Sequence, residues 1–183
     1  PDGKNPTVPA EINEAIASAS DLLARTSDPQ LVDFLLDCAM FSCQAKTAHE
    51  AGSEFLSGYV ALSADAANLR SVCRARKMGR GRDLLRFALS SEGTVATEKL
   101  LDVLPEALPS LFFSWLAPAA AAAAAGEQMS SIDRLCDNAL MAYIREAKFV
   151  TYGEQPAAAY LAARESEMTQ IRIIMAGRSS GLS

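Results

Sequence analysis

The chain contains the same helical pattern twice, at a constant offset of 102 residues. An acid, an amide, an aliphatic residue, two arginines and a glycine recur with identical spacing: Asp65, Asn68, Leu69, Arg70, Arg76 and Gly79, then Glu167, Gln170, Ile171, Arg172, Arg178 and Gly181. The register extends upstream, where Phe41 corresponds to Tyr143 and Lys46 to Lys148. We infer two copies of one helical unit, and repeats of this kind usually form scaffolds rather than catalytic sites.

The composition favours helices over strands. Half of the residues are hydrophobic but only 7% are aromatic, and no segment alternates convincingly between apolar and polar residues. We predict an all-α fold of pseudo-repeated lobes, with helices over about 10–25, 29–51, 54–78, 83–89, 97–101 and 132–149 and a last long helix that begins near Glu154. We expect one lobe over 1–116, an alanine-rich connector over 117–127 and part of a further lobe over 128–183.

Each copy of the pattern places an apolar stripe on one helix face. The stripes consist of Leu62, Ala66, Leu69 and Cys73 in the first copy and Met168, Ile171 and Met175 in the second. We expect both stripes to face a core, bordered by six seam residues: Asp65, Asn68, Arg70, Glu167, Gln170 and Arg172. An arginine at a seam can donate to a helix-end carbonyl or to a neighbouring carboxylate. The seams either hold helices of this chain together or form a partner surface.

Positive charge is concentrated in one segment of an acidic chain. Seven basic residues and one acid lie in residues 70–86, although the net charge of the chain is −5. Such a segment suits an orienting contact with an acidic or polar surface. The candidate interface residues are Arg74, Arg76, Arg80, Arg82 and Arg86; a solvated, lipid-facing or purely structural role is the alternative.

Cysteines and apolar runs indicate the environment of the chain. The four cysteines show no C-x-x-C spacing, which favours small buried thiols and a reducing compartment over disulfides or metal ligands. The longest apolar run, 115–125, contains Pro118 and is far shorter than the roughly 20 residues that a membrane span needs. We expect no signal peptide and no transmembrane span, and a chain that is part of a longer polypeptide.

No group of residues suits catalysis. His49 is the single histidine, and no Walker phosphate loop or nucleophile elbow is present. The acid pairs Asp133/Asp137 and Glu165/Glu167 are expected on solvated helix faces. We therefore predict a non-enzymatic protein without cofactor or metal.

Several segments together resemble a known family. The stretch 152–161, followed by Glu165, Glu167 and the run 171–178, resembles the C-terminal signature of the C subunits of archaeal and bacterial V-type (A-type) ATPases, whose eukaryotic relatives are the vacuolar d subunits. The run 65–76 is similar to the preceding repeat of that family. The second copy departs from the family pattern, because Glu167 and Gln170 stand where the first copy has the shorter acid Asp65 and the shorter amide Asn68.

The resemblance implies that the chain covers the second and third of three helical lobes, which form part of a funnel-shaped bundle. It also implies a non-catalytic central-stalk connector in a rotary ATPase, peripheral on the cytoplasmic face of the membrane and present once per complex. Its partners would be the rotor-shaft subunits and the membrane rotor ring, with torque passing between ATP hydrolysis or synthesis and proton or sodium transport. The alternative is an α-helical adaptor or nucleic-acid-binding scaffold that uses residues 70–86, although stacking aromatic residues are missing there.

Overall fold

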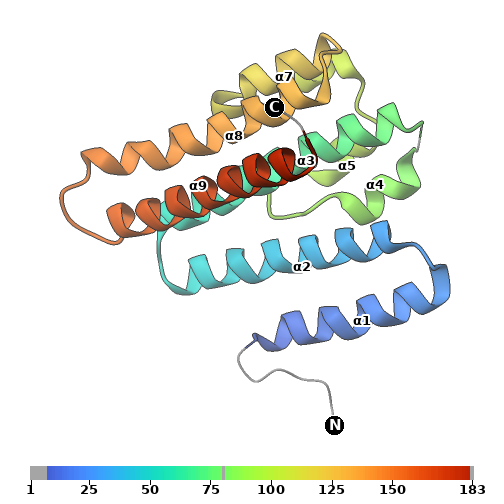
Figure 1. The fold of residues 1–183 in the computed structure, drawn as a ribbon, viewed down its shortest axis with the longest axis horizontal. Helices are drawn as coiled ribbons and strands as arrows, with labels where there is room; N and C mark the ends of the chain where they lie inside the picture. The colour runs from blue at the N-terminus through green and yellow to red at the C-terminus, as the bar shows by residue number, and fades with distance from the viewer. Residues whose placement is uncertain (1–7, 80, 182–183) are drawn as a thin grey trace.

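The computed structural model describes residues 8–79 and 81–181, and these form an all-α fold, as predicted (Figure 1). No strand occurs in these residues. In chain order the elements are α1 (Ala10–Thr26), α2 (Pro29–Glu50), α3 (Glu54–Lys77), α4 (Arg82–Ala88), α5 (Thr97–Leu101), η1 (Pro105–Ala107), α6 (Leu108–Leu111), η2 (Ser114–Leu116), α7 (Ala117–Ala124), α8 (Met129–Arg145), η3 (Glu146–Phe149) and α9 (Gln155–Ser179).

Capping residues set the boundaries of the long helices. The Asp28 side chain accepts a hydrogen bond from the Gln30 amide at 3.0 Å, with Pro29 in the first turn of α2. The Ser53 hydroxyl caps α3 by accepting from the Leu56 amide at 3.1 Å. Gly79 follows α3 with φ +62°, a left-handed conformation that glycine adopts without strain. The predicted starts of both helices are confirmed.

The helix α3 lies at the centre of the bundle. It packs against α2 and α4 on one side and α8 on another, and α9 crosses in front of it in Figure 1. The helix α1 packs on α2 and lies at the edge of the molecule (Figure 1). Because α3 contacts elements from both halves of the chain, its side chains decide how these elements are held together.

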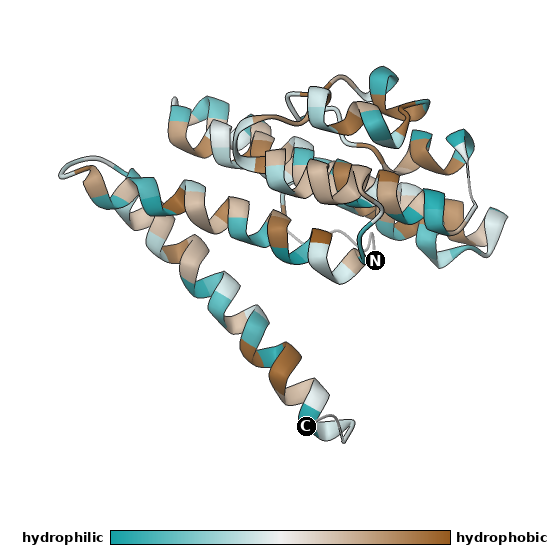
Figure 2. Cartoon of the chain, turned by 90° about the horizontal axis from the view of Figure 1, so that it is seen from above, coloured by the Kyte–Doolittle hydropathy of each residue, from teal (hydrophilic) through white to brown (hydrophobic). Residues whose placement is uncertain are grey.

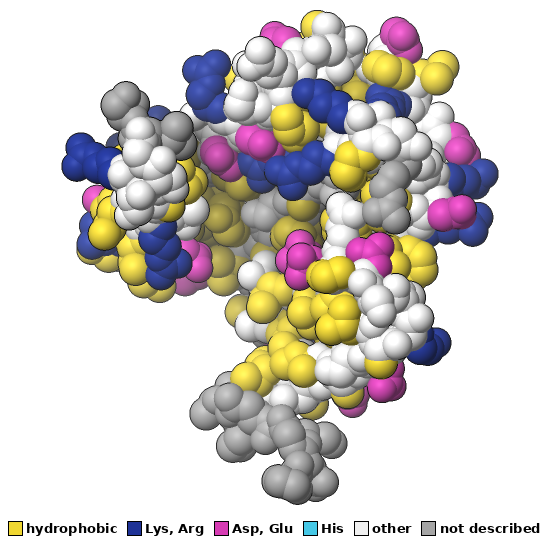
Figure 3. Space-filling model, turned by 45° about the vertical axis from the view of Figure 1, so that its right-hand side comes forward, with side chains coloured by type: hydrophobic (Ala, Val, Ile, Leu, Met, Phe, Trp, Pro, Cys, Tyr) yellow, Lys and Arg dark blue, Asp and Glu magenta, His cyan; other side chains and the backbone are white. Residues whose placement is uncertain are grey.

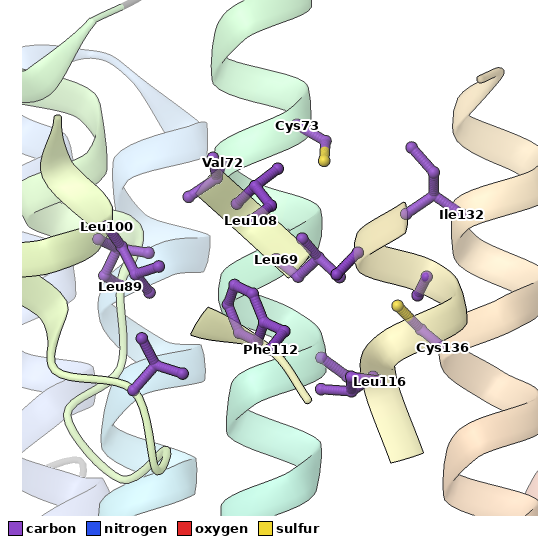
Figure 4. Packing of buried hydrophobic residues seen from close by; sticks show 14 of the residues in the cluster. Leu69, Val72, Cys73, Leu89, Leu100, Leu108, Phe112, Leu116, Ile132 and Cys136 are labelled. Atoms are coloured by element: carbon purple, nitrogen blue, oxygen red, sulfur yellow. The ribbon is translucent and has the colours of Figure 1, made fainter. Parts of the chain in front are cut away.

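The main core surrounds the predicted stripe of α3. Leu69 is fully buried and faces Ile132 and Cys136 of α8 (Figure 4). The alanine-rich segment forms the helix α7, whose buried side chains Ala119, Ala120 and Ala122 belong to the same core cluster. Small side chains allow α7 to approach its neighbours closely. The expected core position of the first stripe is confirmed at Ala66, Leu69 and Cys73.

The helix α9 differs from α3 because most of it is exposed. Its first half packs near Ala159 against α8 and η3, and its second half extends away from the body (Figure 2). Met168, Ile171 and Met175 are 51%, 48% and 64% exposed. The expectation that the second stripe faces a core is therefore wrong within this chain, because no described helix covers the second half of α9.

The cysteines are free thiols in two kinds of environment. Cys73 and Cys136 are buried, whereas Cys38 and Cys43 are half-buried. Burial raises the pKa of the Cys136 thiol to about 11, although the nearby Arg70 opposes the shift. At neutral pH, Cys136 is therefore an unreactive thiol.

We expect iodoacetamide at pH 7.5 to alkylate Cys136 at least about tenfold more slowly than Cys43, because the thiolate is the reactive form and Cys136 is inaccessible. Mass spectrometry of the alkylated peptides over time measures both rates. In guanidinium chloride the two rates should converge. Equal rates in the native protein would contradict the burial of Cys136.

Candidate partner interface

Two seam residues of α3 hold the loop between α4 and α5. The Asp65 carboxylate accepts hydrogen bonds from the amides of Thr94 at 3.0 Å and Val95 at 3.2 Å, and from the Thr94 hydroxyl. The Asn68 amide group donates to the Ser90 carbonyl at 2.9 Å and accepts from the Ser90 amide at 2.8 Å. Both seam residues are buried. The loop is thereby fixed to α3 through its own backbone.

Gly93 allows this loop to approach α3. A Cβ atom at this position would lie 2.2 Å from Oδ1 of Asp65 and 3.4 Å from Nδ2 of Asn68. Only a residue without a side chain fits this gap. The sequence indicates a turn at residues 90–93 but not that its backbone binds Asp65 and Asn68, because no local pattern shows which helix a loop will contact.

Arg70 joins α3 to α8. Its Nη2 donates to the backbone carbonyl of Asp133 at 2.9 Å and to the Asp137 carboxylate, and its Nε lies 3.1 Å from Oδ1 of Asp133. Arg74, one turn further, has its Nη2 3.4 Å from the same Asp133 oxygen. The side chains of Asp133 and Asp137, expected on a solvated helix face, are 34% and 64% exposed, and both also bind an arginine of another helix.

The seam residues of the second copy have no such partners among residues 8–79 and 81–181. Glu167 pairs with Arg164 and the Gln170 amide reaches the Ser166 hydroxyl at 3.5 Å, both within α9. Arg172 is exposed and forms no ion pair with a described residue. The structure therefore brings Asp65, Asn68 and Arg70 into contact with other elements, but not their counterparts.

The basic segment is partly neutralised by this chain. Arg74 meets Asp133, and Arg82 has its Nη1 3.1 Å from Oδ2 of Asp102. Arg76 is half-buried and Arg86 is exposed, and neither forms an ion pair with a described residue. Arg80 lies outside the described residues. Surface ion pairs are worth roughly 0–1 kcal/mol, so Arg82 can exchange Asp102 for a partner at low cost.

A groove of about 410 Å³ opens between α2, α3 and α8. The aromatic rings of Phe34 and Phe41 line it together with charged side chains: Asp37, Arg70, Arg74, Asp133 and Asp137. Burial raises the pKa of the Asp37 carboxyl, and repulsion from Asp33 adds to the shift. Figure 3 shows basic and acidic side chains side by side above an apolar hollow, with the end of α9 standing apart. Aromatic and charged groups of both signs suit a protein partner.

Among the residues that the structure describes, no three His, Cys, Asp or Glu side chains are grouped so that they could hold a metal ion. None of the helices in residues 8–79 and 81–181 is long and apolar enough to cross a membrane.

Comparison with known proteins identifies the family. Residues 9–183 match the family model described as ATP synthase (C/AC39) subunit. The chain belongs to this family. Members of the C/AC39 family are structural, non-catalytic subunits of the ATP synthase, so the prediction of a non-enzymatic protein is confirmed. No curated protein and no solved structure matches the chain. Membership places the chain in an ATP synthase complex of the rotary type.

Proposed function

We propose that the chain acts as a central-stalk connector of a rotary ATPase. It joins the rotor-shaft subunits to the membrane rotor ring and transmits torque between ATP hydrolysis or synthesis and proton or sodium transport. It lies peripherally on the cytoplasmic face of the membrane, in one copy per complex. The family match over residues 9–183 is the observation that carries this proposal.

The contacts of α3 support a role in transmitting force. A connector must resist sliding of its helices against one another when it is loaded. The carboxylate of Asp65 and the amide of Asn68 bind the 90–95 loop, and Arg70 binds α8. Hydrogen bonds from buried and charged groups are directional and costly to break, so these contacts oppose sliding of α3.

Two surfaces are proposed to contact partners. The basic segment presents Arg82 and Arg86 to polar loops of the ring or to acidic residues of the shaft, and Arg74, Arg76 and Arg80 lie in the same segment. The groove between α2, α3 and α8 offers aromatic and charged side chains to a protein element. The net charge of −5 and the lack of stacking aromatic residues in 70–86 disfavour the nucleic-acid alternative.

We expect the double variant Arg82→Glu and Arg86→Glu to weaken binding to the shaft or the ring at least about tenfold, because it reverses two exposed charges at the contact. Pull-downs of the protein with purified shaft subunits and with detergent-solubilised rings measure this. Circular dichroism should show unchanged folding, since both side chains are exposed.

The variant Arg25→Glu and Lys148→Glu is the matched control. It introduces the same charge change at two exposed positions outside the basic segment and should leave binding within about twofold. If the variant with Arg82→Glu and Arg86→Glu binds as well as the wild type, the basic segment is not part of the interface. If the wild-type protein binds neither the shaft nor the ring, the proposed connector function is wrong.

A further inference from the structure

The helix α9 is held to the other described helices near its start. Among residues 155–179, all of which the structure describes, only Ala159 is buried. It packs with Ile144 and Ala147 in a small core cluster that is separate from the main core. Beyond this cluster, α9 extends away from the body of the molecule (Figure 2). The contacts that hold α9 therefore lie towards one end of the helix.

Two grooves border the line along which α8 and α9 touch. One, of about 370 Å³, lies beside the first turns of α9, near Pro156. The other, of about 240 Å³, lies further along α9, near Thr169. Met141 and Ile144 of α8 line both grooves. Close-packed interiors leave few voids larger than a water molecule, so these grooves give α9 room to change its direction.

Gly153 allows the chain to turn between η3 and α9. Its φ is +113°, a conformation in which other residues are strained. Glu154 follows as the N-cap residue of α9. Hinges absorb a change of direction in a few residues at the end of an element. With 25 residues, α9 is roughly 37 Å long, so a turn of about 10° at Gly153 moves its far end by about 6 Å.

A hydrogen bond between the two repeats holds the start of α9. The Ser53 hydroxyl donates to the Glu154 carboxylate at 2.8 Å, and it accepts from the Leu56 amide as the cap of α3. Hydrogen bonds from the Glu154 amide and from the Ser53 hydroxyl lower the pKa of the Glu154 carboxyl. The acceptor is therefore charged at neutral pH, which makes the bond stronger than one between neutral groups. The turn before α3 thereby holds the turn before α9.

The helix α8, in contrast, is fixed to α3 near both of its ends. Near its start, Asp133 binds Arg70. Near its end, the Tyr143 hydroxyl donates to the Phe55 carbonyl at 2.9 Å, and the two rings stack with their centroids 5.2 Å apart. Gly58 leaves room for this contact, since a Cβ atom there would lie 2.3 Å from the Tyr143 hydroxyl oxygen. A change in the direction of α9 therefore takes place at the turn before it, and not by movement of α8.

We propose that α9 is a hinged helix, which turns about Gly153 and whose direction relative to α3 is set by the hydrogen bond from Ser53 to Glu154. Glu154 is thus a positioning residue. Both the hinge and the bond lie at the start of α9, so they act in the same way whatever the rest of the helix contacts. In a connector, load on α9 would turn it about this hinge; only this consequence rests on the proposed function.

The test measures the direction of α9 in the intact chain. Spin labels on unnatural amino acids leave the four cysteines unlabelled, and double electron–electron resonance gives the distances. Labels at Glu98 and Arg178 report on α9, and labels at Glu50 and Glu98 report on the body; all three positions are exposed. We expect Glu154→Ala to shift or widen the distances of the first pair by at least about 6 Å, as a turn of about 10° does. The second pair should not change.

Glu154→Gln is the matched control. Its amide oxygen still accepts from the Ser53 hydroxyl, so the distances should stay close to those of the wild type. Ser53→Ala should have the same effect as Glu154→Ala, and the double variant should add nothing, because both changes remove one bond. Glu154 is exposed, so its variants do not threaten folding, and circular dichroism checks the helix content of each protein.

Three results would overturn the proposal. The first is an unchanged distance between Glu98 and Arg178 in Glu154→Ala. The second is an equal change in Glu154→Ala and Glu154→Gln, which would assign the effect to the charge at the start of α9 and not to the bond with Ser53. The third is a change in the body pair of the same size, which would mean that the whole bundle loosens. None of these measurements involves the shaft or the ring, so their failure is distinct from failure of the connector.

Discussion

Replacing Leu69 with alanine is expected to lower the free energy of unfolding by about 2–5 kcal/mol. The side chain is fully buried against α8 and the main core. Truncation removes apolar contacts and leaves a cavity among packed neighbours, so both effects reduce stability. Urea unfolding followed by circular dichroism gives the difference between variant and wild type.

Ile171→Ala is the matched control, since Ile171 occupies the equivalent position in α9 at 48% exposure. We expect a loss below about 0.5 kcal/mol, because a half-exposed side chain gains little from folding and alanine favours a helix. Equal losses at the two positions would mean that the face of α9 is covered in solution. A loss below about 0.5 kcal/mol for Leu69→Ala would contradict its core position.

The helices could be predicted from the sequence because their signals are local. Asp28 with Pro29 starts α2, Ser53 starts α3, and Gly79 ends it. The stripe of α3 follows from the spacing of its apolar residues. The short helices between residues 105 and 116 were not predicted, because segments of three or four residues carry no clear periodicity.

The surroundings of the repeat could not be predicted. Leu69 and Ile171 occupy equivalent positions in the repeat, yet one is buried and the other exposed. Burial depends on whether another helix reaches the face, and a local pattern contains no information on that. Similarly, the sequence shows that residues 70–86 are basic, but not which acids lie next to them. Asp102 and Asp133, which pair with Arg82 and Arg74, lie outside this segment in the sequence.

Asn68→Ala is expected to destabilise the protein by about 2–5 kcal/mol through a different cause. The Asn68 side chain satisfies both the amide and the carbonyl of Ser90, and both residues are buried. Each buried polar group that loses its partner costs about 1–3 kcal/mol. The 90–95 loop should loosen as well, so the Ser90 amide should exchange hydrogen faster than in the wild type.

Gln170→Ala is the matched control for Asn68→Ala, because it removes a side-chain amide at the equivalent position without breaking buried hydrogen bonds. Gln170 corresponds to Asn68 in the repeat but is exposed, and its amide reaches Ser166 of its own helix. The expected change is within about 0.5 kcal/mol of wild type. If Asn68→Ala lowered stability without faster exchange at Ser90, the loss would come from packing, and the loop would be held by Asp65 alone. An unchanged stability would show that water replaces the side chain, which would weaken the argument that these contacts stiffen α3 against load.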